Sequence, residues 1–113
     1  MGALSLGVLI MIDTLEAKIQ LKHPDATKVA PRISAATYET DRAAILEVID
    51  GDQVDVPFVG LADKVAAILA PPVLKEPGSV GWYTTAVKLH LEANGEIERV
   101  PGSQPQRLRR VQR

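Results

Sequence analysis

The chain has 113 residues, of which 46% are hydrophobic and 24% are charged, as in one ordinary globular domain with a modest core. It contains no cysteine, which excludes disulfides, thiolate catalysis and cysteine-ligated zinc and is typical of a cytoplasmic protein. The net charge of −1 is unevenly divided: residues 1–81 carry seven Lys and Arg against eleven Asp and Glu, and residues 82–113 carry six against three. That C-terminal excess is small for a protein dedicated to nucleic acid.

Residues 3–12, ALSLGVLIMI, form an apolar run that is too short for a membrane span of about 20 residues. The run has no positive flank and no cleavage site for a signal peptide, and Leu6 stands where myristoylation needs Ser or Thr. Residues 1–12 are either a docked apolar arm or an extension upstream of a protein that begins at Met11. Because such a run would leave a large apolar patch on a monomer, we expect it to cover a groove on its own chain or on a partner. A homodimer is the simplest arrangement, and no membrane partner is expected.

The domain itself is expected over residues 13–113, beginning with a strand. The alternation of Ala17, Ile19 and Leu21 predicts one buried strand face, and residues 24–33 are expected to be a loop. Ser34 is a candidate cap for a first helix that ends at residues 50–52, and apolar residues spaced at helical intervals give this helix one buried stripe.

Residues 53–60, QVDVPFVG, predict a short edge strand, because proline is tolerated at a sheet edge. A second helix is expected over residues 58–69 from the helical spacing of its apolar residues. Residues 71–81, PPVLKEPGSVG, contain three prolines and two glycines, so no helix is expected there.

The third helix is expected to begin at Trp82 and to stop at Asn94-Gly95. Trp82 and Tyr83 at its start are either an exposed aromatic platform or, as favoured, part of the apolar group that closes the core. The opposite, solvent-facing arc consists of Thr84, Thr85, Lys88 and Glu92. Residues 96–100 and 106–111 flank the turn-rich segment PGSQP and predict a hairpin. One core is expected to contain Trp82, Ile45, Leu46, Val65, Ile68, Val87 and Leu91.

This element order predicts an α+β fold: a single winged-helix domain of three helices and a C-terminal β-hairpin wing, with an additional N-terminal strand. Residues 81–99, GWYTTAVKLHLEANGEIER, resemble the third helix and wing of a small bacterial family of uncharacterised winged-helix-like proteins. The resemblance rests on Gly81, Trp82, Tyr83, the Leu89-x-Leu91-Glu92 centre and Gly95, and extends over roughly residues 17–111. It implies a fold and no activity.

No motif organises a catalytic site, so we expect neither an enzyme nor a small-molecule substrate, and no cofactor or metal. The acidic run Asp50, Asp52 and Asp55 fails the EF-hand pattern, which needs a glycine at position 6 and a glutamate at position 12. His90 lies in the apolar arc of the third helix. A pH switch or a ligand is one interpretation, and a buried imidazole hydrogen-bonded to a helix end or a carbonyl is the favoured one.

Duplex DNA is the first predicted partner, because this scaffold often serves DNA and its wing is rich in arginine. The residues expected to bind nucleic acid are Thr84, Thr85, Lys88, Arg99, Arg107, Arg109 and Arg110. Low sequence specificity is expected, because the helix offers few base-reading side chains and Glu92 would repel phosphates. The alternative is a winged helix used for protein contact or dimerisation. Arginines that are paired with carboxylates would favour this alternative.

Overall fold

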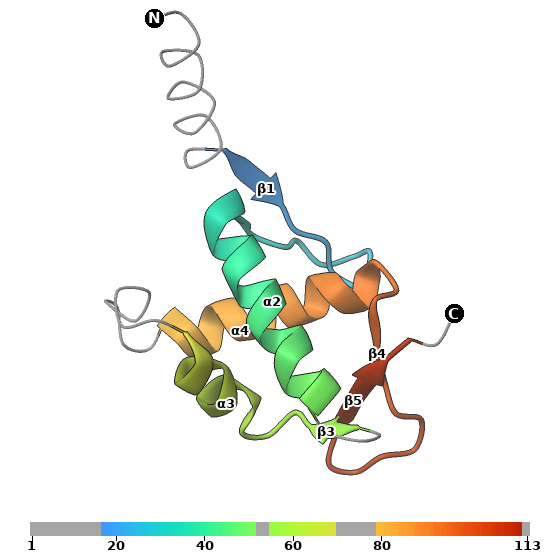
Figure 1. Cartoon of the computed structure of the whole chain (residues 1–113). Coiled ribbons are helices and arrows are strands. Elements are labelled where there is room, and N and C mark those ends of the chain that lie inside the picture. The colour runs from blue at the N-terminus through green and yellow to red at the C-terminus, as the bar shows by residue number, and fades with distance from the viewer. Residues whose placement is uncertain (1–16, 52–54, 70–78, 112–113) are drawn as a thin grey trace, which may run out of the picture.

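The structure is a computed structural model that describes residues 17–51, 55–69 and 79–111 (Figure 1). These residues form an α+β fold with the element order β1 (Lys18–Gln20), β2 (Arg32–Ser34), α2 (Ala35–Gly51), β3 (Val56–Pro57), α3 (Leu61–Ile68), α4 (Ser79–Ala93), β4 (Ile97–Arg99) and β5 (Arg107–Arg110). The predicted N-terminal arm, most of the proline-rich link and Asp52 lie outside the described residues.

Two small antiparallel sheets flank the helices. At the N-terminal end, β1 pairs with β2 and brings Lys18 opposite Ser34. At the C-terminal end, the order is β3-β5-β4, so the hairpin β4–β5 gains the predicted edge strand β3 as a third member. The strand β2 was missed by the sequence analysis, which expected a loop there, because its pairing partner lies 14 residues upstream rather than next to it.

The first helix, α2, begins where the cap predicts. The backbone amide of Thr37 donates a hydrogen bond to Ser34 Oγ over 3.0 Å, which satisfies one of the free amides in the first turn. Ile33, just before the cap, and Tyr38, in the first turn, are both buried. They provide the apolar contact that fixes the entry of the chain into the helix.

The second and third helices begin at other residues than expected. The amide of Phe58 bonds to the carbonyl of Gln106, so the chain continues along the sheet before α3 starts at Leu61. Gly60, with a φ of 86°, provides the left-handed turn between them. The helix α4 already begins at Ser79, so the expectation of no helix before Trp82 was wrong for residues 79–81. It ends at Ala93, just before the predicted stop at Asn94-Gly95, where Gly95 has a φ of 73°.

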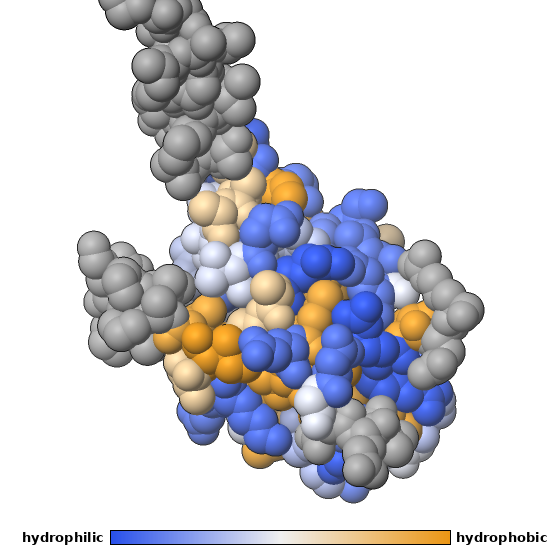
Figure 2. Space-filling model, in the orientation of Figure 1, coloured by the Kyte–Doolittle hydropathy of each residue, from blue (hydrophilic) through white to orange (hydrophobic). Residues whose placement is uncertain are grey.

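The core lies where α2, α3 and α4 meet, and the inner face of the C-terminal sheet closes one end. Figure 1 shows α2 crossing α4, with α3 beside the start of α4. The deepest apolar side chains come from every one of these elements: Ile45, Val56, Leu61, Val65, Val87, Leu91, Ile97 and Leu108. On the surface drawn in Figure 2, apolar side chains gather over α3 and the start of α4. Among the described residues, no helix has the length and apolar character needed to cross a membrane.

Candidate functional site

Three of the four residues expected on the solvent-facing arc of the third helix have buried side chains instead: Thr84, Lys88 and Glu92, whose side chain is 7% exposed. Thr84 and Lys88 are each 1% exposed, so the sequence-based phase of α4 was wrong for them. The ammonium of Lys88 lies over the ring of Phe58, 4.6 Å from its centroid, and 3.0 Å from Glu92 Oε2. Burial lowers the pKa of Lys88, while the Glu92 carboxylate opposes that shift. Neither Thr84 nor Lys88 is available to a base edge in this conformation.

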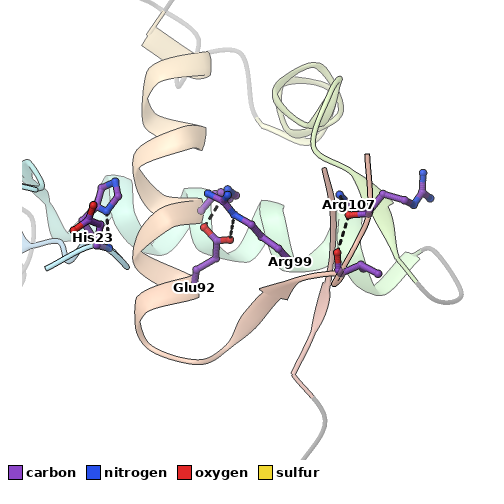
Figure 3. Close-up of polar contacts among 8 residues, drawn as sticks. His23, Glu92, Arg99 and Arg107 are labelled. Atoms are coloured by element: carbon purple, nitrogen blue, oxygen red, sulfur yellow. Dashed lines mark hydrogen bonds and ion pairs between the residues drawn. The ribbon is translucent and has the colours of Figure 1, made fainter. Parts of the chain in front are cut away.

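Glu92 connects the helix to the wing. Its carboxylate pairs with Lys88 through one oxygen and accepts a hydrogen bond from Arg99 Nε, 2.9 Å away, through the other. Figure 3 shows Glu92 projecting from α4 toward Arg99 of β4. The expected repulsion between Glu92 and a phosphate is therefore weakened, because Lys88 and Arg99 already offset the charge of this carboxylate.

The remaining wing arginines also face carboxylates. Arg109 Nε donates to Glu98 Oε2 over 2.7 Å, directly across the β4–β5 ladder. Arg107 pairs with Asp55, and Arg110 lies 3.9 Å from Asp50. The guanidinium groups stay partly exposed, with side-chain exposures between 37% and 43%. Each of these three arginines thus has a carboxylate beside it.

The outer face of α4 is instead occupied by Trp82, Thr85 and Leu89, which recur at helical spacing. Trp82 was expected to close the core but is 53% exposed, and its ring packs edge-on against Tyr83. The expected core residue Ile68 is likewise exposed, at 42%. The other expected core residues, Ile45, Leu46, Val65, Val87 and Leu91, are all buried.

A hollow of about 170 Å³ lies between this face and the segment after β1. Trp82, Thr85 and Leu89 line one side of it, and His23, Val29 and Pro31 line the other. A second, shallower hollow adjoins it, shares His23 and Val29, and reaches Ala93 near the end of the helix. We call the two hollows together the α4 groove. Sequence reasoning missed it because Trp82 was assigned to the core, and because the loop that contains Val29 gives no local signal of the helix it faces.

The rim of the α4 groove is basic. Lys22 and Lys28, both exposed, line it together with the ring of His23. The nearby Asp25 carboxylate accepts hydrogen bonds from the amide and hydroxyl of Thr27, at 3.0 and 2.7 Å. In Figure 3, His23 lies on the opposite side of α4 from Glu92, so the groove and the wing are separate surfaces.

His90 is buried, as the favoured interpretation predicted, but its partner is an amide rather than a carbonyl. The backbone amide of Lys22 donates to His90 Nδ1 over 2.9 Å, and the side-chain amide of Asn94 lies 3.0 Å from Nε2. The ring of Tyr38 meets the imidazole edge-on. Burial lowers the pKa of His90, and the positive charge of Lys22 lowers it further. This histidine therefore ties the segment that lines the groove to α4.

Within the described residues, no group of three or more histidines and carboxylates could hold a metal ion. Asp50 and Asp55, two members of the acidic run, lie against Arg110 and Arg107.

No curated protein and no solved structure matches the chain. A family model described as a family of unknown function, DUF6958, matches residues 18–108, which is most of the chain. The match spans the strand β1, all three described helices and most of the hairpin, and the chain therefore belongs to the DUF6958 family.

Proposed function

We propose that this domain is a non-enzymatic winged-helix module that binds another protein through the α4 groove. The winged-helix assignment is supported by the order helix, strand, helix, helix and hairpin from α2 onward. It is also supported by the sheet order β3-β5-β4, in which the first strand joins the hairpin. Fold alone does not select a partner, so the argument for protein contact depends on side chains.

The observation that carries the proposal is the composition of the outer face of α4. This is the helix that would enter the major groove in a DNA-binding winged helix. It presents Trp82 and Leu89 beside a hollow, and its lysine points inward. Tryptophan is enriched among residues that dominate protein interfaces, where its large ring fills a pocket on the partner. Val29, 96% exposed across the hollow, extends the same apolar surface.

Nucleic-acid binding is the second candidate, and its support is the exposure of the wing arginines. Surface ion pairs contribute only about 0–1 kcal/mol, so Arg107 or Arg109 could exchange its carboxylate for a phosphate at little cost. Against this, the helix beside the wing offers Thr85 as its single exposed member of the predicted base-reading set. The two candidates therefore predict contacts on different surfaces.

Site-specific photo-crosslinking in the native cells separates the two candidates. A benzophenone amino acid replaces Thr85 in the α4 groove, Arg109 on the wing or Glu47, an exposed residue of α2 that serves as the control. We expect discrete protein adducts from position 85 and none from position 47. Nucleic-acid adducts from position 109, with no protein adduct from position 85, would replace protein contact by DNA or RNA binding.

A further inference from the structure

We propose that the occupant of the α4 groove is the apolar run of residues 3–12 from a second copy of this chain, so that two chains exchange N-terminal arms. This inference rests on the proposed protein contact at the same groove and names the partner. The length of the groove, its chemistry and the place where the arm leaves the fold all favour this exchange.

The groove has the shape of a trough for an extended segment. Its two hollows share lining residues and follow α4 from Trp82 to Ala93, a distance of about 16 Å at 1.5 Å per helical residue. An extended chain covers that distance with about five residues at 3.3 Å each. The ten residues of the apolar run are therefore sufficient to fill the trough along its whole length.

The chemistry of the two partners is complementary. The floor of the trough is apolar at Trp82, Ala86 and Leu89, and Lys22 and Lys28 stand on its rim. Residues 1–16 contain no lysine or arginine, and the apolar run is followed by Asp13 and Glu16. An apolar segment with an acidic end satisfies both the floor and the rim of the trough. Burying the run also removes the apolar patch that it would leave on an isolated chain.

The attachment point of the arm favours a second copy over the same chain. Ala17 is fixed at the start of α2, because its carbonyl accepts a hydrogen bond from the amide of Ala35 over 2.8 Å. The lining of the trough begins at Gln20, at the other end of β1, about 10 Å away by strand geometry, and continues past His23. Residues 13–17 span at most about 17 Å when fully extended, so most of them would be consumed in turning back along β1. In a two-fold dimer, the arm of each chain reaches the trough of the other without this reversal.

Complementation between two full-length variants tests the exchange. Thr85→Glu places a charge in the trough and leaves the arm intact, whereas Ile10→Glu places a charge in the arm and leaves the trough intact. Each variant alone is expected to associate at least about tenfold more weakly than the wild-type dimer in sedimentation equilibrium. A 1:1 mixture restores dimers, because one intact arm then meets one intact trough. Thr40→Glu, at an exposed position of α2, is the matched control and is expected to dimerise like the wild type.

Disulfide trapping gives a second, independent readout, because the natural chain has no cysteine. A Thr85→Cys chain mixed with a chain carrying Leu6→Cys, Val8→Cys or Ile10→Cys is expected to give a covalent dimer on mild oxidation. A Thr40→Cys chain mixed with the same arm variants is expected to form no covalent dimer. Circular dichroism of every variant verifies that the fold is kept.

A monomeric wild type at high concentration would overturn the exchange, as would a dimer indifferent to both Thr85→Glu and Ile10→Glu. A mixture that fails to recover dimers would overturn it too, because an arm folded onto its own chain cannot be complemented. The proposed function has a separate outcome. Photo-adducts from position 85 with a protein of different mass would keep protein contact at the groove and reject the second copy as the occupant.

Discussion

Lys88 Nζ lies 3.0 Å from Glu92 Oε2 one turn further along α4, and the two side chains are only 2% and 7% exposed. The pair is closed off by the ring of Phe58, over which the ammonium lies. A buried ion pair of this kind depends on both members, because either charge alone would stay in a poorly solvated place. Arg99 reaches the same carboxylate from the solvent side, with a side chain that is 56% exposed.

Glu92→Gln is therefore expected to destabilise the domain by about 3–5 kcal/mol, because it leaves the Lys88 ammonium buried without a counter-charge. Arg99→Gln removes the exposed partner of the same carboxylate and is expected to cost only about 0–1 kcal/mol. Urea denaturation of both variants measures the difference. Equal effects would mean that Lys88 and Glu92 do not form a buried pair in solution.

The same pair explains where the sequence-based interpretation was wrong. Helical periodicity sorts residues by type, and it placed Thr84 and Lys88 outward because both are polar. The burial of Lys88 involves a neighbour far away in the sequence, Phe58, which lies 30 residues before it. The long stem of a lysine can be buried when its charged end finds a partner. Trp82, assigned to the core for its size, is displaced to the surface by the same rotation of the helix.

Features that depend on local signals were predicted well. The cap of α2 at Ser34, the glycine stop at Gly95 and the hairpin around PGSQP each follow from a few adjacent residues. The strand β2 and the α4 groove could not be predicted in this way. Both form where the segment of residues 21–34 meets elements distant in the sequence, β1 in one case and α4 in the other.

The buried imidazole of His90 makes stability depend on pH. Burial and the charge of Lys22 lower its pKa in the folded state below the ordinary value of 6.5. The unfolded chain thus binds a proton more readily, so the stabilisation is complete above about pH 6.5 and is lost as the pH falls from there through the lowered pKa. Protonation of Nδ1 would also oppose the amide of Lys22, which donates to that atom.

We expect His90→Gln to lose this dependence, so that its free energy of unfolding changes less than that of the wild type between pH 7 and pH 5. Thr40→Gln, at an exposed position of α2, changes no titratable group and is the control that is expected to keep the wild-type slope. Denaturant titrations at several pH values give the slopes. An unchanged slope in His90→Gln would show that another group titrates.

Asp41 is expected to act in the opposite direction. Its side chain is buried in α2, and burial raises its pKa from 3.8 to about 6. The folded state holds this proton more tightly than the unfolded state does, so stability falls as the pH rises from about 4 through 6 and then levels off. Asp41→Asn keeps the shape without the charge and is expected to gain about 1–3 kcal/mol at pH 7, with no gain at pH 4. Glu47→Gln, exposed on the same helix, is expected to change little at either pH. A loss of stability in Asp41→Asn at pH 7 would reveal an ionised, partnered carboxylate.

One residue at which the expected and the observed core agree, and one at which they differ, give a further test. Leu46 is buried as expected, and Leu46→Ala should cost about 2–5 kcal/mol through lost burial and the cavity left behind. Trp82→Ala, although it removes a larger side chain, is expected to cost less, because more than half of Trp82 is exposed. Thermal denaturation ranks the two variants, and the reverse ranking would place Trp82 in the core after all.

Duplex DNA binding is the prediction that separates the wing from the α4 groove. Because Arg99, Arg107 and Arg109 each have a carboxylate partner, we expect association with unrelated duplexes only at low salt, and none at physiological salt. Fluorescence anisotropy across a salt series measures this for the wild type, for Arg107→Gln combined with Arg109→Gln, and for Lys18→Gln at the far end of the molecule as the control. Binding that persists at physiological salt would contradict the expectation. If phosphate contacts carry that binding, the log of the affinity should fall with the log of the salt concentration by about 0.9 per phosphate contacted. A slope that falls by about one unit for each arginine removed, and is unchanged in the control, would locate those phosphates on the wing. The arginines would then exchange their carboxylates for phosphates, and nucleic-acid binding would take the place of protein contact as the function of this domain.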